Sequence, residues 1–255
     1  AARLRRDGIR PGSVVAIRAR PELEAVLLLA VLHEGAVSLH GSEAVLKAYG
    51  DGIDFLLGDR PRSSSVSARV IDVGTEFMLS LGAVNARVEV APLTDFAPCR
   101  VIFSSGTTGT PKGVAFTVAS LMSRIASAHT YWMPRHPFMC LLGLDTVSGF
   151  QTFAWTIMNG RVYVVPGDGA ANLALIREHA IRAIKTSPAR LENLLDAAGA
   201  QGVTPGELAL EAVQVAGSLL TPALARRCEQ VFGHRPVYLY GSTEVGTVTR
   251  GVFDP

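Results

Sequence analysis

FSSGTTGTPKGV, residues 103–114, is the stretch that most constrains the fold and chemistry of this chain. It places three glycines, three threonines, two serines and one lysine between two apolar runs. Glycines let the backbone curl tightly and come close to a ligand, so hydroxyls and N–H groups can face one small volume. Lys112 adds a positive charge there. This combination predicts a cradle for a polyphosphate. The alternative is a flexible turn without a ligand.

The loop differs from a Walker A motif, because Pro111 stands where that motif needs its second glycine. The residues before the loop predict a strand over 100–103, and those after it predict a helix over 117–131. Ligands in open α/β sheets gather at the carboxyl ends of strands. We therefore expect the cradle to follow a strand and to precede a helix.

Short apolar runs alternate with helical patterns along the chain. This alternation predicts layered α/β structure with largely parallel sheets flanked by helices. Two prolines and a loss of periodicity near residues 132–137 suggest a boundary between two similar subdomains, 1–132 with the glycine loop and 133–255. The expected strands are 13–17, 36–39, 55–57, 70–73, 100–103, 139–142, 162–165, 183–186, 212–215 and 237–240. The expected helices are 21–35, 117–131, 147–158, 173–180, 190–198 and 222–232.

A second cluster, YLYGSTEVG at residues 238–246, follows the last expected strand. It combines aromatic rings, hydroxyls and one carboxylate in a turn of small residues. Such a turn can stack a base, hold a phosphate oxygen and ligate Mg²⁺. The alternative is a strand that ends in a capped turn.

The order SGTTGTPKG at 105–113 and the run YGSTE at 240–244 resemble signatures of the adenylate-forming superfamily. This superfamily includes acyl-CoA synthetases, peptide-synthetase adenylation domains and luciferases. The resemblance implies an adenine partner in Tyr240, an α-phosphate contact in Thr243 and a magnesium ligand in Glu244. Residues 215–220, VAGSLL, are similar to a family turn whose backbone faces adenine. The implied nucleotide-binding residues are Ser104, Ser105, Gly106, Thr107, Thr108, Gly109, Lys112, Gly217, Ser218, Tyr240, Gly241 and Thr243, with Lys112, Thr243 and Glu244 as the catalytic set.

Residues 142–150, LGLDTVSGF, resemble a family segment beside the acyl pocket. In that register Thr146 takes the place of a usual histidine, which departs from a standard fatty or aryl acid pocket. Asp145 echoes the aspartate that binds the substrate ammonium in amino-acid-activating relatives. The alternative is that Asp145 or Thr146 caps the following helix. The implied pocket residues are Asp145, Thr146, Gly149 and Phe150.

The implied reaction joins a carboxylate to MgATP, giving an acyl-adenylate and pyrophosphate. Members of the superfamily then usually transfer the acyl group to a thiol of CoA or of a carrier-protein phosphopantetheine. The resemblance also implies a small C-terminal lid domain with a late catalytic lysine. The sequence has no lysine after Lys185, so we expect this chain to be a large-domain portion without the lid.

Composition excludes several other classes of protein. The formal charge of +2 is too small to suggest a nucleic-acid binder. Cys99, Cys140 and Cys228 are far apart and odd in number, which fits a reducing cytoplasm and argues against a disulfide scaffold or a zinc site. The apolar run 25–32 is too short to span a bilayer, and no signal peptide is expected.

Two functions from other classes stay open at this point. One is a non-catalytic ATP- or AMP-binding or interaction module derived from the same fold. The other is an unrelated phosphate-loop NTPase, in which the cluster at 238–246 would have no place.

Overall fold

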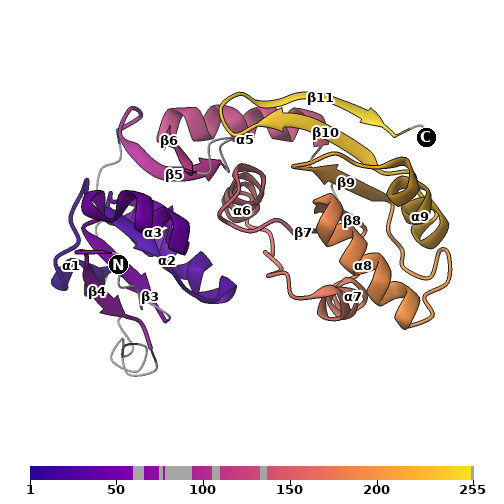
Figure 1. Cartoon of the computed structure of the whole chain (residues 1–255), viewed down its shortest axis with the longest axis horizontal. Coiled ribbons are helices and arrows are strands. Elements are labelled where there is room, and N and C mark those ends of the chain that lie inside the picture. Colours follow the sequence, from indigo (N-terminus) through magenta and orange to yellow (C-terminus); the bar gives the residue numbers. More distant parts are fainter. Residues whose placement is uncertain (60–65, 75–76, 78–93, 105–109, 133–136, 254–255) are drawn as a thin grey trace. The chain divides into compact units, whose positions relative to one another are not determined.

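Two compact units, Ala1–Ser123 and Arg124–Pro255, make up the computed structural model of the chain (Figure 1). The structure describes residues 1–59, 66–74, 77, 94–104, 110–132 and 137–253, with the backbone alone for 128–132. The change from one unit to the other falls within helix α5 (Val118–Trp132). The boundary between residues 132 and 133 stays a prediction, because it adjoins residues outside the described ranges.

A six-stranded sheet forms the centre of the first unit. Its elements are α1 (Ala2–Arg6), β1 (Val14–Ile17), α2 (Pro21–His33), β2 (Val37–His40), α3 (Glu43–Tyr49), η1 (Gly50–Gly52), β3 (Phe55–Gly58), β4 (Arg69–Asp72), β5 (Pro98–Ser104) and β6 (Lys112–Thr117). The strand order is β4-β3-β1-β2-β5-β6. All neighbouring strands pair in parallel except β6, which runs antiparallel to β5 at the edge.

The helices of the first unit follow from local sequence and from burial. Pro21 occupies the first turn of α2, where its missing N–H costs nothing. Helix α2 packs on β1, β2 and β3 and buries apolar side chains that include Leu27, Leu28 and Val31. Helix α3 begins after Ser42, whose hydroxyl accepts a hydrogen bond from the Val45 N–H. Val45 and Leu46 then pack on the sheet beside Leu39.

A five-stranded sheet forms the centre of the second unit, in the order β11-β10-β9-β8-β7. Its elements are β7 (Phe138–Cys140), α6 (Val147–Met158), α7 (Gly169–Glu178), β8 (Ala183–Thr186), α8 (Pro188–Ala200), β9 (Ala212–Ala216), α9 (Pro222–Phe232), β10 (Val237–Ser242) and β11 (Gly246–Val252). Strands β7 to β10 are parallel, and β11 pairs antiparallel with β10.

Helices cover both faces of this second sheet (Figure 1). Helices α7, α8 and α9 bury one face in a large apolar cluster that includes Met139, Ile184 and Val213. Helix α6 covers the other face, where the Trp155 ring packs against Phe138 with 5.6 Å between ring centroids. Among the residues that the structure describes, no helix is long and apolar enough to cross a membrane.

The predicted fold class is confirmed: both units are α/β, and both sheets are largely parallel. Two local predictions were wrong. Residues 162–165 form no strand. Val162 is exposed and Val164 packs into the apolar core, so the alternation in this segment reflects burial and not pairing with another strand. The glycine loop is followed by strand β6 and not directly by a helix, because residues 112–117 fold back to pair with β5.

Candidate functional site

The glycine loop connects two antiparallel strands, β5 and β6, at the edge of the first sheet. Ser104, the last residue of β5, lies opposite Lys112, the first residue of β6. The Ser104 hydroxyl donates to the Lys112 carbonyl at 3.5 Å, and the Lys112 side chain is exposed to solvent. Both ends of the loop are thereby fixed on adjacent strands. Ser105, Gly106, Thr107, Thr108 and Gly109 lie outside the described residues, so their roles stay predictions.

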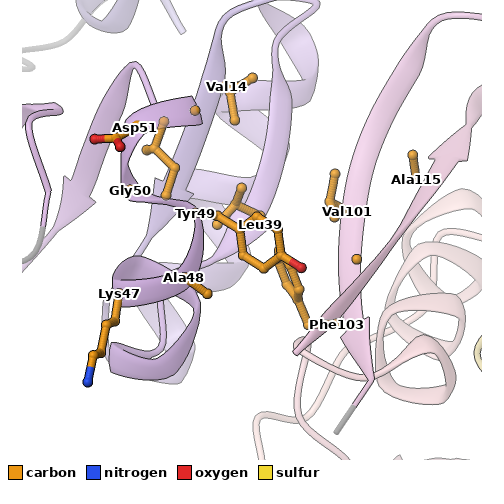
Figure 2. A pocket seen from close by; sticks show the side chains of 13 residues that line it. Val14, Leu39, Lys47, Ala48, Tyr49, Gly50, Asp51, Val101, Phe103 and Ala115 are labelled. Carbon is orange, nitrogen blue, oxygen red and sulfur yellow. The ribbon is translucent and has the colours of Figure 1, made fainter. Parts of the chain in front are cut away.

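Tyr49, the last residue of α3, holds both flanks of this loop. Its hydroxyl donates a 2.5 Å hydrogen bond to the Pro111 carbonyl, which directly precedes β6. Its ring packs against Phe103 of β5, with 5.2 Å between centroids. Figure 2 shows Tyr49 and Phe103 beside a cavity of about 650 Å³ in the first unit. The sequence analysis missed Tyr49, because nothing in the glycine motif points to a residue about 60 positions upstream.

The second cluster forms a β-hairpin in the second unit. Strand β10 carries Tyr240 and Gly241, residues 243–245 form the turn, and β11 returns beside β10. The Tyr240 side chain is 65% exposed, so its ring is available to stack on a base. A Cβ at Gly241 would lie 2.1 Å from the Gly246 carbonyl oxygen, so close strand pairing requires glycine there. The pairing of β10 with β11 shifts register between Tyr240 and Gly241. This irregularity lies between the aromatic residue and the turn.

Arg124 of α5 fixes the turn of this hairpin. Its guanidinium donates to the backbone carbonyl of Glu244, which leaves the Glu244 carboxylate exposed. Partial burial lowers the pKa of Arg124, and the negative charge of Glu244 opposes that shift. No pattern in the sequence points to Arg124, because its contact with Glu244 spans 120 residues along the chain.

The third cluster lies at the carboxyl end of β9. Ala216 of β9 pairs with Leu239 of β10, so the following residues, Gly217 and Tyr240, lie at the same edge of the sheet. Gly217 has a φ of +99°, a backbone conformation that favours glycine. Gly217 and Ser218 are exposed. The structure thus places Gly217, Ser218, Tyr240 and Gly241 at one edge of the second sheet, and Thr243 and Glu244 follow in the turn of the hairpin.

The predicted acyl-pocket segment leads into helix α6 at the carboxyl end of β7. Thr146 is the N-cap of α6: its hydroxyl accepts from the Gly149 N–H at 3.0 Å and donates to the Gly143 carbonyl at 2.9 Å. The capping interpretation is therefore confirmed for Thr146. Asp145 is exposed, whereas Gly149 and Phe150 are buried. The role of these four residues in binding an acid stays a prediction.

The residues present fit a magnesium ion that is shared with phosphates. Among the described residues, no group of three or more histidine, cysteine or acidic side chains could hold a metal by itself. Mg²⁺ commonly binds through one or two carboxylates together with substrate phosphates and water. The exposed carboxylate of Glu244 suits that mode of binding.

Comparisons with known proteins find similar sequences and folds. A family model described as "AMP-binding enzyme" matches residues 48–255. Malpinin synthetase of Mortierella alpina is 26% identical over 93% of this chain and 3% of its own length. The medium/long-chain fatty-acid–CoA ligase FadD8 of Mycobacterium tuberculosis is 30% identical over 67% of this chain and 31% of its own length.

Among solved structures, o-succinylbenzoate coenzyme A synthetase from Bacillus subtilis, in complex with ATP and magnesium, superposes with a TM-score of 0.77. It is 22% identical to this chain, and the match covers 98% of this chain and 54% of that protein. At this identity the likeness shows the shared fold. The chain spans less than two thirds of the length of each of these three proteins.

Proposed function

Since the chain belongs to the AMP-binding enzyme family, we propose that it takes part in ATP-dependent activation of a carboxylic acid. A carboxylate oxygen attacks the α-phosphorus of ATP, the bond from that phosphorus to the bridging oxygen breaks, and pyrophosphate leaves. The products are an acyl-adenylate and pyrophosphate. The observation that carries the proposal is the exposed edge of the second sheet, where Gly217 lies beside Tyr240 and the turn after β10 carries Glu244.

Each residue of the proposed site either positions the nucleotide or offsets the charge of its phosphates. The Tyr240 ring stacks on adenine, beside the backbone of Gly217 and Ser218. Thr243 donates a hydrogen bond to the α-phosphate. Lys112, with the hydroxyls and N–H groups of the glycine loop, offsets the charge of the leaving pyrophosphate. Magnesium, when bound at Glu244, supplies further stabilisation of the phosphate charge.

A second half-reaction completes the proposal for the whole protein. The acyl group passes from AMP to a thiol, either of CoA or of a phosphopantetheine on a carrier protein. The name of FadD8, a fatty-acid–CoA ligase, supports CoA as the acceptor. Cys99, Cys140 and Cys228 are free thiols, which supports a reducing compartment such as the cytoplasm.

Carboxylate-dependent exchange between ATP and labelled pyrophosphate tests the first half-reaction. The panel spans fatty, aryl and amino acids, and the protein is first shown to be folded by circular dichroism. Exchange with one class of acid supports the proposal and names the class. Phosphate release without a carboxylate would instead point to an NTPase. Nucleotide binding without exchange for any acid would favour a non-catalytic binding module.

The variant Lys112→Ala tests the assignment of the glycine loop. It removes the exposed ammonium that we assign to the distal phosphates, so the affinity for ATP falls about tenfold or more while that for AMP changes little. Isothermal titration of both nucleotides measures the two effects. An equal loss for ATP and AMP would contradict the assignment.

A further inference from the structure

Three buried polar side chains form a row across three adjacent strands of the second sheet. Cys140 of β7 pairs in register with Lys185 of β8, and Lys185 pairs in register with Gln214 of β9. Their exposed fractions are 2%, 7% and 1%. Side chains alternate between the faces of a strand, and the preceding residues of these strands enter the apolar core under α7–α9. The polar row therefore faces α6.

Helix α6 supplies no charge to this row. Its sequence, VSGFQTFAWTIM, contains no acidic residue. The Thr152 hydroxyl contacts Cys140 and also donates to the Ser148 carbonyl at 2.7 Å. The Thr156 hydroxyl donates to the Thr152 carbonyl at 2.7 Å. Besides the Trp155 indole, which packs on Phe138, α6 therefore offers this row the hydroxyls of Thr152 and Thr156, which are already engaged.

Within the described part of the chain, two members of the row lack the partners that burial demands. No ion pair or hydrogen bond joins the Lys185 ammonium to another described residue, and the Oε1 atom of Gln214 has no hydrogen-bond partner there. Burial lowers the pKa of Lys185. A buried polar group without a partner destabilises the folded chain, because it loses its hydrogen bonds to water. Two such groups at neighbouring positions point to a ligand that completes the site.

The row lies just below the edge at which the nucleotide residues meet. Gln214 of β9 precedes Gly217, the residue that follows this strand, by three residues, a rise of about 10 Å. Lys185 is one residue from the carboxyl end of β8, and Cys140 ends β7. The row and this edge therefore share strand β9.

We propose that Lys185 and Gln214 bind an anionic group at the far end of the acyl substrate, so that the preferred acid is a short dicarboxylic acid. The inference rests on the proposed function. The Lys185 ammonium donates to the distal carboxylate in a charge-assisted hydrogen bond. The Gln214 amide, whose oxygen and nitrogen can exchange places by a flip, donates a second hydrogen bond from its NH₂ group. The first carboxylate stays at the edge, where it reacts with ATP.

A matched pair of acids tests this proposal. Straight-chain dicarboxylic acids of about four to six carbons are compared with their monomethyl esters, which keep the chain and remove the distal charge. In ATP–pyrophosphate exchange, kcat/KM for the diacid exceeds that for its monoester by about tenfold to a hundredfold, the range expected for a charge-assisted hydrogen bond. In Lys185→Met this preference disappears, mainly through KM for the diacid. Exposed Lys47 supplies the control variant Lys47→Met, which keeps the preference.

The outcomes separate this proposal from the proposed function. Exchange that favours the monoester, or an unchanged ratio in Lys185→Met, overturns the role of Lys185 while carboxylate activation stands. If no acid supports exchange, the proposed function fails, and ligand-observed NMR of the same diacid and monoester decides the binding site. Selective binding of the diacid that is lost in Lys185→Met and in Gln214→Met supports the site. Equal signals for both acids overturn it.

Discussion

Replacing Gly149 with alanine tests how tightly α6 is joined to the loop before it. Gly149 lies in the first turn of α6, and a Cβ there would lie 2.0 Å from the Gly143 carbonyl oxygen and 2.7 Å from the Leu142 carbonyl oxygen. Real Cβ atoms essentially never come closer than 3.0 Å to such atoms. The backbone must therefore move by about 1 Å or more.

The expected cost follows from what this movement breaks. The Gly143 carbonyl accepts from the Thr146 N–H at 3.1 Å and from the Thr146 hydroxyl at 2.9 Å, and the same hydroxyl caps Gly149. Overpacking costs about 1–3 kcal/mol, and weakening the cap adds about 1 kcal/mol. The higher helix propensity of alanine returns about 1 kcal/mol. The net loss in free energy of unfolding is about 1–3 kcal/mol.

Urea unfolding followed by tryptophan fluorescence measures the loss, because Trp155 is buried in the same helix. Gly199 in α8 gives the matched control, since its Cβ would meet open space and the residue is exposed. Gly199→Ala gains about 0.5–1 kcal/mol from helix propensity. A Gly149→Ala protein as stable as the wild type, or as stabilised as Gly199→Ala, would refute the packing argument.

Three further predictions concern single residues. Burial lowers the pKa of Lys185 in the folded chain, so protonation below about pH 10.5 favours the unfolded chain, and Lys185→Met is more stable than the wild type at about pH 7 but not at about pH 10. Urea unfolding at both pH values measures the difference in free energy of unfolding between variant and wild type, and a difference that did not narrow at high pH would contradict the lowered pKa. Glu244→Gln keeps the backbone contact with Arg124 and removes the exposed charge, so half-saturating Mg²⁺ in the exchange reaction rises about tenfold, and an unchanged Mg²⁺ titration would exclude Glu244 as the ligand. Tyr49→Phe removes the hydrogen bond to Pro111 and keeps the ring beside Phe103, so the affinity for ATP falls about threefold to tenfold without loss of folding. Calorimetry that found the same affinity in variant and wild type would show that the loop does not need the hydrogen bond from Tyr49.

Residues close together in sequence were predictable. Helices α6 and α9 span the predicted ranges, because a threonine N-cap precedes each one and an apolar pattern runs along it. The clusters at 103–114 and 238–246 were visible as runs of small and hydroxyl residues. Strand β6 was missed, because KGVAFT lacks a clear alternation and its pairing with β5 is a tertiary contact.

Contacts between distant residues could not be predicted. Arg124 meets Glu244 and Tyr49 meets Pro111 only because the fold places their elements side by side. Lys185 is one of three lysines in the chain, and its burial depends on the pairing of β8 with β7 and β9. A sequence pattern shows which face of a strand a residue occupies, but not which helix covers that face.

Because β5 and β6 pair on either side of the glycine loop, the loop can be exchanged for another sequence. Because Ser104 and Lys112 are paired, the two ends of the loop are held at adjacent backbone positions before any ligand binds. We predict that β5 and β6 keep their register when residues 105–111 are replaced by another sequence of equal length. Differences in nucleotide handling between relatives of this chain could therefore be transplanted through seven residues, with the rest of the first unit left intact.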